Sequence, residues 1–447
     1  MRVLVFHGYM LRGTGSNIYN VNLARALARL GHEVHLLCQD REVRIEGVEI
    51  HNPDIGGLLP VYVKDPYEGF EVKTFPELSE AELDRYIDAN VAAVQGVAAA
   101  AGGIDLVLAN HLVMGPAILA RAGIAPFAAK IHGSALEYTV KPHPRFLPYA
   151  REGMEAASGV LVGSGHTGES LWAALPDVPG LREKTRLGPP GVDIDEFRPD
   201  GEREQLVAFV GKLIVSKGVD LLLAAWPLVR AAHPQARLEI AGYGAYEEGL
   251  RRLLAALDRG DLDDAREVAR RGWGLEGGEE QPLPILSAFL ADPPAGYAEQ
   301  ARAAAGSVEF VGRLEHREVA SFFPRAEAMV MPSTFPEAFG MVAVEAAACG
   351  TLPVSAGHSG MLEVSRQLRS QLPEEVGALT SFPVKEGAVE AIAARIGRWL
   401  ALPEAERRQA RESLVATVAR LWSWEGVARG VLAAAAGELE DLPRPGS

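Results

Sequence analysis

Two glutamates eight positions apart form the clearest chemical pattern in the second half of the chain. Glu337 and Glu345 lie in FPEAFGMVAVEAAACG, residues 335–350. The segment follows the strand-like run AMVMPS and has an apolar body over residues 342–348, which predicts a helix packed against a sheet. Ligands of α/β proteins bind where strands end, so both acids are candidate ligand contacts. The alternative is that both are solvated on a surface helix.

The start of this predicted helix has the properties of an anion site. The backbone N–H groups of a first helical turn have no partner within the helix and lie at the positive end of its dipole. Here they belong to Phe339, Gly340 and Met341, and Gly340 would let a phosphate or sugar approach the backbone closely. Glu337, outside the helix, could accept hydrogen bonds from sugar hydroxyls, and Glu345 could reach a ribose.

Two lysines follow another predicted strand, in FVGKLIVSKGVDLLLAA, residues 209–225. The strand ends at Gly211, and Lys212 and Lys217 precede a helix. Two cations at the carboxyl end of a strand suit a diphosphate. The alternative is that these lysines only keep a loop soluble.

The first half of the chain has a glycine loop, RGTGSNIYN, residues 12–20. As a dinucleotide fingerprint it is incomplete, because Gly13 and Gly15 fit but Ile18 occupies the place of the third glycine. Asp40, near the end of the second predicted strand, could be the ribose acid of a dehydrogenase. A nicotinamide-dependent oxidoreductase therefore remains an alternative.

Other polar residues follow predicted strands or lie between domains. His132, in KIHGSALEY, ends a strand at the edge where α/β sheets bind ligands, whereas His7 is interpreted as structural. Asp193 and Asp195, in VDIDEF, form an Asp-x-Asp pair without a third ligand nearby. We interpret VDIDEF as a hinge segment and predict no metal site.

Short apolar runs alternate with helical or loop segments along the chain, which predicts an α/β fold with parallel sheets covered on both faces. The expected strands of the first half are residues 2–6, 33–38, 104–109, 126–131 and 159–164, with a helix over 17–30. Those of the second half are residues 205–211, 237–242, 307–312, 328–333 and 351–356. A Pro-, Gly- and charge-rich stretch at 188–204 separates the two halves.

These patterns predict two Rossmann-like domains, residues 1–198 and 199–419. Residues 245–306 are longer than a usual connection and are expected to be a helical insertion. The C-terminal segment, residues 420–447, is alanine-rich and is expected to be a helix that packs back on the first domain.

Composition limits the classes of protein that fit. The chain has 447 residues and a net charge of -15, which argues against nucleic-acid binding. A basic stretch, Lys130–Arg151, is expected to be a solvated loop, with peripheral membrane contact as an alternative. The two cysteines, Cys38 and Cys349, the short apolar run at the N-terminus and the lack of a membrane-spanning run suggest a reducing cytoplasm.

Taken together, these motifs resemble the retaining GT-B glycosyltransferases that carry the E-x7-E motif, a family 4-like group. The likeness runs through GTGSNIYNVNLARALARLGHEV, KIHGSALEY, GVDIDEFRP, VGKLIVSKGVDLLL, AGYG, FVGRL and PEAFGMVAVEAAACGTLPV, in the order of the family. It implies two Rossmann-like domains that face each other across a cleft. The first would bind mainly the acceptor and the second a sugar nucleotide.

The resemblance also implies roles for individual residues. Glu337 would hold the hydroxyls of the donor sugar, Glu345 the ribose, Lys212 and Lys217 the diphosphate, Gly15 the same phosphates through its N–H, and Arg313 and Leu314 the border of the base. His132 resembles the family histidine beside the anomeric carbon. Lysine at 212 replaces the arginine of many members, and Ala338 replaces a proline.

The function implied is transfer of a hexose from a UDP- or GDP-sugar to a hydroxyl acceptor with retention of configuration and without a metal or other cofactor. Catalysis would rest on positioning and on neutralising the departing diphosphate. A non-catalytic protein that binds sugar nucleotides is a further alternative. The sugar, the base, the acceptor and the oligomeric state are not encoded in readable patterns.

Overall fold

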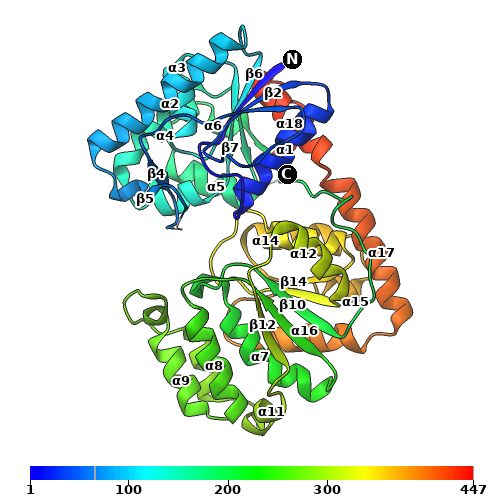
Figure 1. Cartoon of the computed structure of the whole chain (residues 1–447). Helices are drawn as coiled ribbons and strands as arrows, with labels where there is room; N and C mark the ends of the chain where they lie inside the picture. Colours follow the sequence, from blue (N-terminus) through cyan, green and yellow to red (C-terminus); the bar gives the residue numbers. More distant parts are fainter. Residues whose placement is uncertain (65–66, 446–447) are drawn as a thin grey trace. The chain divides into compact units, whose positions relative to one another are not determined.

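The computed structural model describes residues 1–64 and 67–445, which form two compact units (Figure 1). Residues 1–191 and 422–445 belong to the first unit, and residues 192–421 to the second. The division lies inside the Pro- and Gly-rich stretch 188–204. No helix of the described residues is long and apolar enough to cross a membrane.

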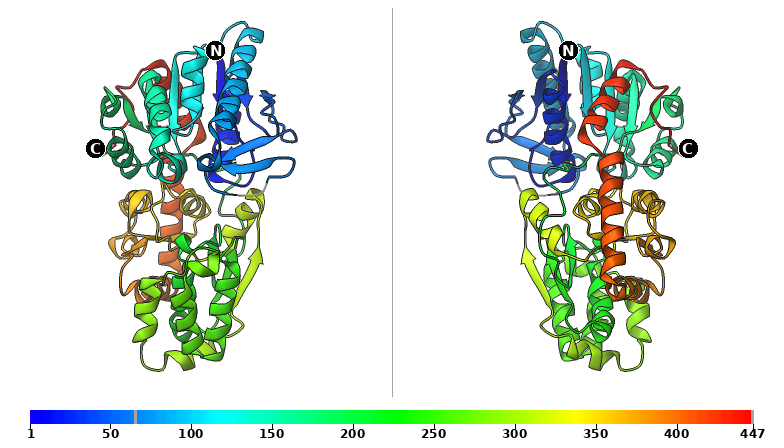
Figure 2. Two further views of the ribbon diagram at one scale, coloured as in Figure 1. Left: turned by 90° about the vertical axis from the view of Figure 1, so that its left-hand side faces the viewer. Right: turned by 90° about the vertical axis from the view of Figure 1, so that its right-hand side faces the viewer.

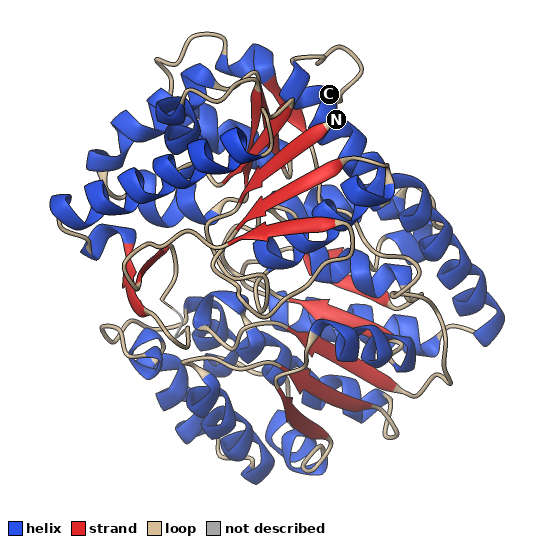
Figure 3. Ribbon diagram, turned by 45° about the horizontal axis from the view of Figure 1, so that its top comes forward, coloured by secondary structure: helices blue, strands red, loops and turns tan. Residues whose placement is uncertain are grey.

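The first unit is built on a parallel sheet of seven strands in the order β3-β2-β1-β6-β7-β8-β9 (Figure 3). The strands are β1 (Arg2–Phe6), β2 (Glu33–Leu37), β3 (Val48–His51), β6 (Leu106–Asn110), β7 (Phe127–Ile131), β8 (Gly159–Val162) and β9 (Thr185–Leu187). The central strands β6, β7 and β8 are buried along their whole length, which explains their continuous apolar sequences. A separate pair, β4 (Leu58–Val61) and β5 (Glu71–Thr74), forms a small parallel sheet.

Helices cover both faces of this sheet and create two cores. The helices are α1 (Gly15–Arg29), α2 (Glu80–Ala100), α3 (Gly115–Ala122), α4 (Leu147–Ala156), α5 (Gly165–Ala174), α6 (Leu181–Lys184) and α18 (Trp424–Ala436). Side chains of α1 and α18 share one core, with Trp424 in edge contact with Tyr19. Side chains of α2, α3 and α4 belong to the other. The C-terminal helix α18 thus packs on α1 and on strands β6 to β8.

The second unit has a parallel sheet of six strands in the order β12-β11-β10-β13-β14-β15. The strands are β10 (Leu206–Val210), β11 (Arg237–Ala241), β12 (Val308–Gly312), β13 (Ala328–Met331), β14 (Leu352–Ala356) and β15 (Ser381–Phe382). The principal helices are α7 (Val219–Ala232), α12 (His316–Phe322), α13 (Met341–Ala348), α14 (Ser359–Arg369), α15 (Glu374–Gly377), α16 (Ala388–Ala401) and α17 (Glu404–Leu421). The predicted α/β architecture with two parallel sheets is confirmed.

Residues 245–306 are helical. They contain α8 (Glu247–Arg259), α9 (Leu262–Arg271), the short turn η5 (Trp273–Glu276), α10 (Pro284–Ala291) and α11 (Tyr297–Ala303). Helices α8, α10 and α11 contact α7, and the Tyr297 hydroxyl donates to the Ala224 carbonyl over 2.6 Å. The segment is therefore anchored on the second unit.

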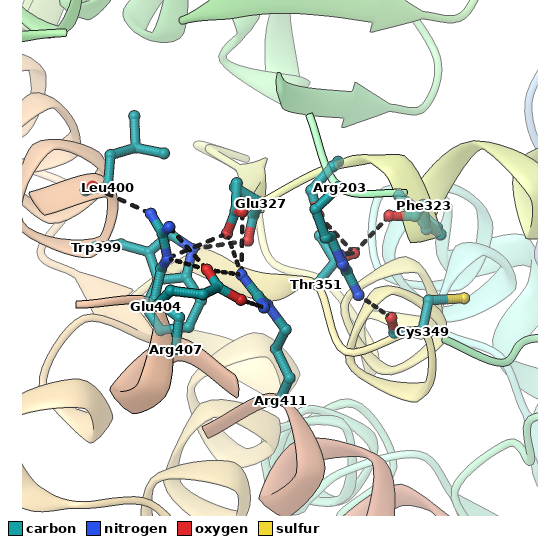
Figure 4. A network of polar contacts seen from close by, with 11 residues as sticks. Arg203, Phe323, Glu327, Cys349, Thr351, Trp399, Leu400, Glu404, Arg407 and Arg411 are labelled. Atoms are coloured by element: carbon teal, nitrogen blue, oxygen red, sulfur yellow. Dashed lines mark hydrogen bonds and ion pairs between the residues drawn. The ribbon is translucent and has the colours of Figure 1, made fainter. Parts of the chain in front are cut away.

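A buried ionic network ties α17 to the second sheet (Figure 4). Glu327, which precedes β13, is 4% exposed, and both of its carboxylate oxygens accept hydrogen bonds from Arg411 over 3.0 and 2.9 Å. The Trp399 indole donates to the Glu327 carbonyl over 2.8 Å. Helix α17, the long orange helix of Figure 2, also packs on α13, so the network holds it against the helix that carries Glu345.

Candidate active site

Lys217 and Glu337 meet at the carboxyl edge of the second sheet. Lys217 ends the turn η4 (Val215–Lys217) after β10, and Glu337 follows β13, the neighbouring strand. The Lys217 ammonium forms an ion pair with Glu337 Oε1, which also accepts from the Ser333 hydroxyl over 2.9 Å. The two charged side chains are 25% and 22% exposed, so ligands can reach both. This is the pair of residues that the sequence analysis assigned to diphosphate and sugar.

A close backbone approach brings the two loops together. Thr334 N–H donates to the Ser216 carbonyl over 2.9 Å. Gly218 adopts φ +65°, and a Cβ atom there would lie 2.1 Å from the Pro332 carbonyl oxygen. Only glycine allows both this conformation and this contact. Lys217 is therefore positioned by the residue that follows it.

A second set of hydrogen bonds fixes the backbone of Glu337. Its N–H donates to the Ser359 hydroxyl over 2.9 Å, and its carbonyl accepts from Gly360 N–H over 3.0 Å. His358 Nε2 lies 2.8 Å from the Ser333 carbonyl, so it carries a proton, and Nδ1 is the acceptor for the Ser359 hydroxyl at 3.1 Å. The sequence analysis missed His358 and Ser359, although a single glycine separates them from a predicted strand.

The helix after Glu337 begins where the sequence indicates. Gly340 precedes α13 with φ +104°, Met341 is its first residue, and Phe339 is buried beside them. The first turn of α13 and the Lys217 ammonium lie in the same unit, at the carboxyl ends of adjacent strands. This arrangement can bind an anion.

Glu345 is buried on α13 and pairs with a histidine that the sequence analysis did not single out. Its Oε1 lies 3.1 Å from Nε2 of His316, the first residue of α12, and Glu196 lies 3.8 Å from the other ring nitrogen. Burial alone would lower the pKa of His316, but the hydrogen bond and charge of Glu345, with Glu196, raise it above its usual value. Glu345 contacting a ribose remains a prediction.

The segment FVGRL, residues 310–314, begins in the last residues of β12 and continues two residues beyond the strand. The Arg313 guanidinium lies 5.2 Å from the centre of the Tyr243 ring and 3.0 Å from Glu315, and Leu314 beside it is half-buried. Tyr243 follows β11, so it stands at the same edge of the sheet. A cation over an aromatic ring at this edge is a surface on which a planar base can stack. Lys212 lies in the loop between β10 and η4.

In the first unit, His132 directly follows β7 and belongs to a polar chain. Its Nε2 donates to Asn110 Oδ1 over 2.8 Å. Asn110 exchanges hydrogen bonds with Asn20, which contacts His7 Nδ1 over 3.0 Å. His7 also contacts Asn17 over 2.9 Å, which agrees with its structural interpretation. Gly15 is the first residue of α1, so its N–H belongs to the first helical turn.

These histidines are electrically neutral. Burial lowers the pKa of His7 to about 4 and takes the pKa values of His132 and His111 well below the usual range, with mutual repulsion of the rings adding to the effect. His111 packs against His132 with ring centres 4.8 Å apart, and neither of its ring nitrogens has a hydrogen-bond partner. His132 is therefore a neutral ring whose Nε2 carries the proton and whose Nδ1 is unprotonated.

Three charged residues of the sequence analysis, Lys130, Asp40 and Asp193, have partners within the protein. Lys130 is not part of a solvated loop: it is 2% exposed on β7, its ammonium donates to the Gly188 carbonyl, and burial lowers its pKa to about 7. The buried Asp40 carboxylate accepts hydrogen bonds from the Arg12 side chain and from backbone N–H groups of the neighbouring loops, so its oxygens are not available to a ribose. Asp193 caps its own turn through Asp195 and Glu196 N–H.

Comparison with known proteins assigns the chain to a family. The model described as "Glycosyltransferase Family 4" matches residues 13–196, and that described as "Glycosyl transferases group 1" matches residues 193–261 and 297–414. The chain belongs to the family 4, group 1 glycosyltransferases. The candidate residues of each unit, Gly15 and His132 in the first and Lys217 and Glu337 in the second, lie within the matched residues. Residues 262–296, which include α9 and α10, fall outside the match.

Curated members of the family and a solved structure agree with this assignment. The chain is 31% identical to a D-inositol 3-phosphate glycosyltransferase from Segniliparus rotundus over 56% of its own length and 46% of that protein, so it spans about half of that relative. It is 28% identical to D-inositol 3-phosphate glycosyltransferase 1 from Catenulispora acidiphila, over 78% and 75% of the two chains. Sucrose-phosphate synthase from Thermosynechococcus elongatus superposes with a TM-score of 0.62 at 22% identity, covering 96% of each chain, and shows the GT-B fold.

Proposed function

We propose that this glycosyltransferase moves a hexose from a nucleoside-diphosphate sugar, a UDP- or GDP-sugar, to a hydroxyl acceptor with retention of anomeric configuration. The proposal rests on the pairing of Lys217 with Glu337 beside the start of α13. A cation for phosphate and an acceptor for sugar hydroxyls are thereby held at one sheet edge. A nucleoside-diphosphate sugar has a phosphate and a sugar hydroxyl close together, so it can use the cation and the hydrogen-bond acceptor at the same time.

Lys217 would neutralise the diphosphate as the bond to the anomeric carbon breaks. Its ammonium has three donors, so it can keep Glu337 and bind a phosphate oxygen together. The N–H groups at Gly340 and Met341 would add a second source of positive potential. Stabilising charge that grows in the transition state is worth more than binding the substrate, because only that effect raises the rate.

Glu337 would orient the sugar. Its Oε1 is already used by Lys217 and Ser333, which leaves Oε2 to accept from sugar hydroxyls. His132, neutral and with Nδ1 free of a proton, would approach the anomeric carbon without opposing positive charge there. We propose that no metal is needed, since Lys217 and the helix start supply the positive potential at the diphosphate.

A donor panel tests the proposal. Purified protein is incubated with UDP- and GDP-hexoses, with and without cell extract or an inositol phosphate, and release of nucleoside diphosphate is measured. The inositol phosphate is included because two relatives are named for that acceptor. Retention is read from the anomeric proton of the product by NMR. A donor that raises the melting temperature without any turnover would instead indicate a sugar-nucleotide-binding protein.

Two variants test the residue roles. Lys217→Ala should lower kcat/KM by about 10²-fold or more, and Glu337→Gln should slow transfer while leaving the fold intact. Lys385→Ala, which removes an exposed lysine of the same unit, is the matched control and should leave the rate unchanged. Wild-type rates in Lys217→Ala would remove the phosphate assignment.

A further inference from the structure

Two neighbouring strands at one edge of the first sheet carry the same tripeptide pattern, glutamate, aliphatic residue, histidine. It is EVH at residues 33–35 on β2 and EIH at residues 49–51 on the edge strand β3. Residues two apart on a strand share a face, and the parallel register sets His35 beside Glu49. The aliphatic residues between them pack in the core with α1, so the acids and histidines gather on the other face.

The ring nitrogens of His35 and His51 lie close to each other, and each lies near one oxygen of the Glu49 carboxylate. His35 Nδ1 lies 3.0 Å from His51 Nε2 and 3.5 Å from Glu49 Oε2, and His51 Nε2 lies 3.8 Å from Glu49 Oε1. Ligands at about 2.0 to 2.2 Å from a tetrahedral zinc ion are about 3.3 to 3.5 Å apart. One ligand atom from each residue lies within 4.8 Å of the other two, so a rotation of the Glu49 carboxylate with small shifts of the rings would let the three side chains bind one ion.

Hydrogen bonding sets the tautomer that metal binding requires. His35 is 3% exposed, and its Nε2 donates to Glu33 Oε1 over 3.2 Å, so its Nδ1 carries a lone pair directed at His51. In the metal-free protein His51 Nε2–H donates to that lone pair. A metal ion would take the place of this proton, which would move to His51 Nδ1. A carboxylate behind a ligating histidine is the usual support of a metal ligand.

We propose that His35, Glu49 and His51 form a binding site for a divalent transition-metal ion, with Zn²⁺ as the best fit, and that Glu33 orients His35. Two imidazoles and one carboxylate suit zinc, whereas Mg²⁺ and Ca²⁺ prefer oxygen ligands throughout. Among the described residues, this is the one group of three or more such side chains close enough to share an ion. Glu49 is 67% exposed, so the fourth position opens to water.

The site is independent of the proposed transfer reaction. It lies between β2 and β3, and a bound ion would clamp the edge strand β3, which pairs with only one neighbour, to the sheet. Edge strands are the part of a sheet most easily opened. The expected effect is therefore local stabilisation of β3.

Calorimetric titration of the chelator-treated full-length chain with Zn²⁺ tests the proposal, with Mg²⁺ as the comparison ion. We expect one Zn²⁺ per chain, a visible spectrum typical of tetrahedral coordination when Co²⁺ is used, and slower amide exchange over residues 48–51. His51→Gln should weaken zinc binding by at least about tenfold, and Glu33→Gln by about 10- to 100-fold. His143→Gln, which removes a histidine of the same unit outside the cluster, should bind as the wild type does.

Three results would overturn the proposal. They are no zinc bound at micromolar concentration, equal zinc affinity in His51→Gln and the wild type, or equal loss in His143→Gln. Circular dichroism of each variant establishes that it is folded, so that lost binding reports on the ligands. Because the readouts are binding and exchange, the outcome does not depend on transferase activity.

Discussion

Acidification from about pH 8 to about pH 5.5 should weaken the first unit and strengthen the second. In the first unit, burial lowers the pKa of His7 from 6.5 to about 4 and that of Lys130 from 10.5 to about 7. In the second, burial raises the pKa of Asp220, in the first turn of α7, from 3.8 to about 7. The pKa values of these buried groups are therefore lowered in the first unit and raised in the second.

The sign follows from which state binds more protons. His7 and Lys130 have lower pKa values in the folded state, so the unfolded chain takes up more protons and the stability of the first unit decreases as the pH is lowered. Over the stated range this amounts to about 1.4 kcal/mol for each group, and the lowered pKa values of His111 and His132 act in the same direction. Asp220 is protonated more readily in the folded state, so the second unit gains about 2 kcal/mol.

Hydrogen exchange resolved by peptide measures each unit separately. After correction for intrinsic exchange, amides of β1 and β6 should lose about 10²-fold in protection, and those of β10 and β13 should gain more than about tenfold. Asp220→Asn, which keeps the shape and the acceptor of the side chain, should abolish the gain. Protection factors that change equally and in the same direction in both units would refute the reasoning that burial displaces the pKa values of these groups. The same pH response in Asp220→Asn as in the wild type would refute it too.

Three further predictions concern the second unit. Glu276, in the segment outside the family match, accepts a hydrogen bond from Val215 N–H over 2.8 Å in the turn that ends at Lys217. Glu276→Ala should therefore lower kcat/KM for the donor by about tenfold, measured by nucleotide release, whereas Glu276→Gln should retain most of the activity. Arg411→Met leaves the Glu327 carboxylate buried without its main partner and should lower the free energy of unfolding, measured with urea, by about 3 kcal/mol. Adding Glu327→Met should recover most of this loss, and a double variant without recovery would contradict the pairing. Gly218→Ala should lower the melting temperature and donor affinity together, because its Cβ would clash with a carbonyl oxygen; a variant with normal donor affinity would contradict the positioning role.

The sheets, and the positions of Lys217 and Glu337 at the ends of strands, could be predicted from the sequence for the same reason, whereas their ion pair was not predicted. Central parallel strands are buried on both faces and read as apolar runs, so their carboxyl ends are easily located. Residues that follow two such strands then gather at one edge. The order of strands, which makes β10 and β13 neighbours, was not needed to expect the two loops to meet, but it is what brings Lys217 onto Glu337.

Other features could not be predicted because they depend on pairing between elements. Strand β3, VEIH, alternates charged and aliphatic residues at an edge and lacks an apolar run. His316 meets Glu345 only because α12 approaches α13, and Lys130 is buried because β7 is central. The repeated EVH and EIH tripeptides were a readable signal for the metal cluster, yet their register is set by the fold.

The return of the C-terminal helix to the first unit has a consequence for biosynthesis. Trp424, Ala428 and Val431 share a core with side chains of α1 and of strands β1, β2, β6, β7 and β8. Chains generally fold domain by domain as they leave the ribosome, starting at the N-terminus. Here one core of the first unit cannot be completed until α18 has been translated, after the whole of the second unit.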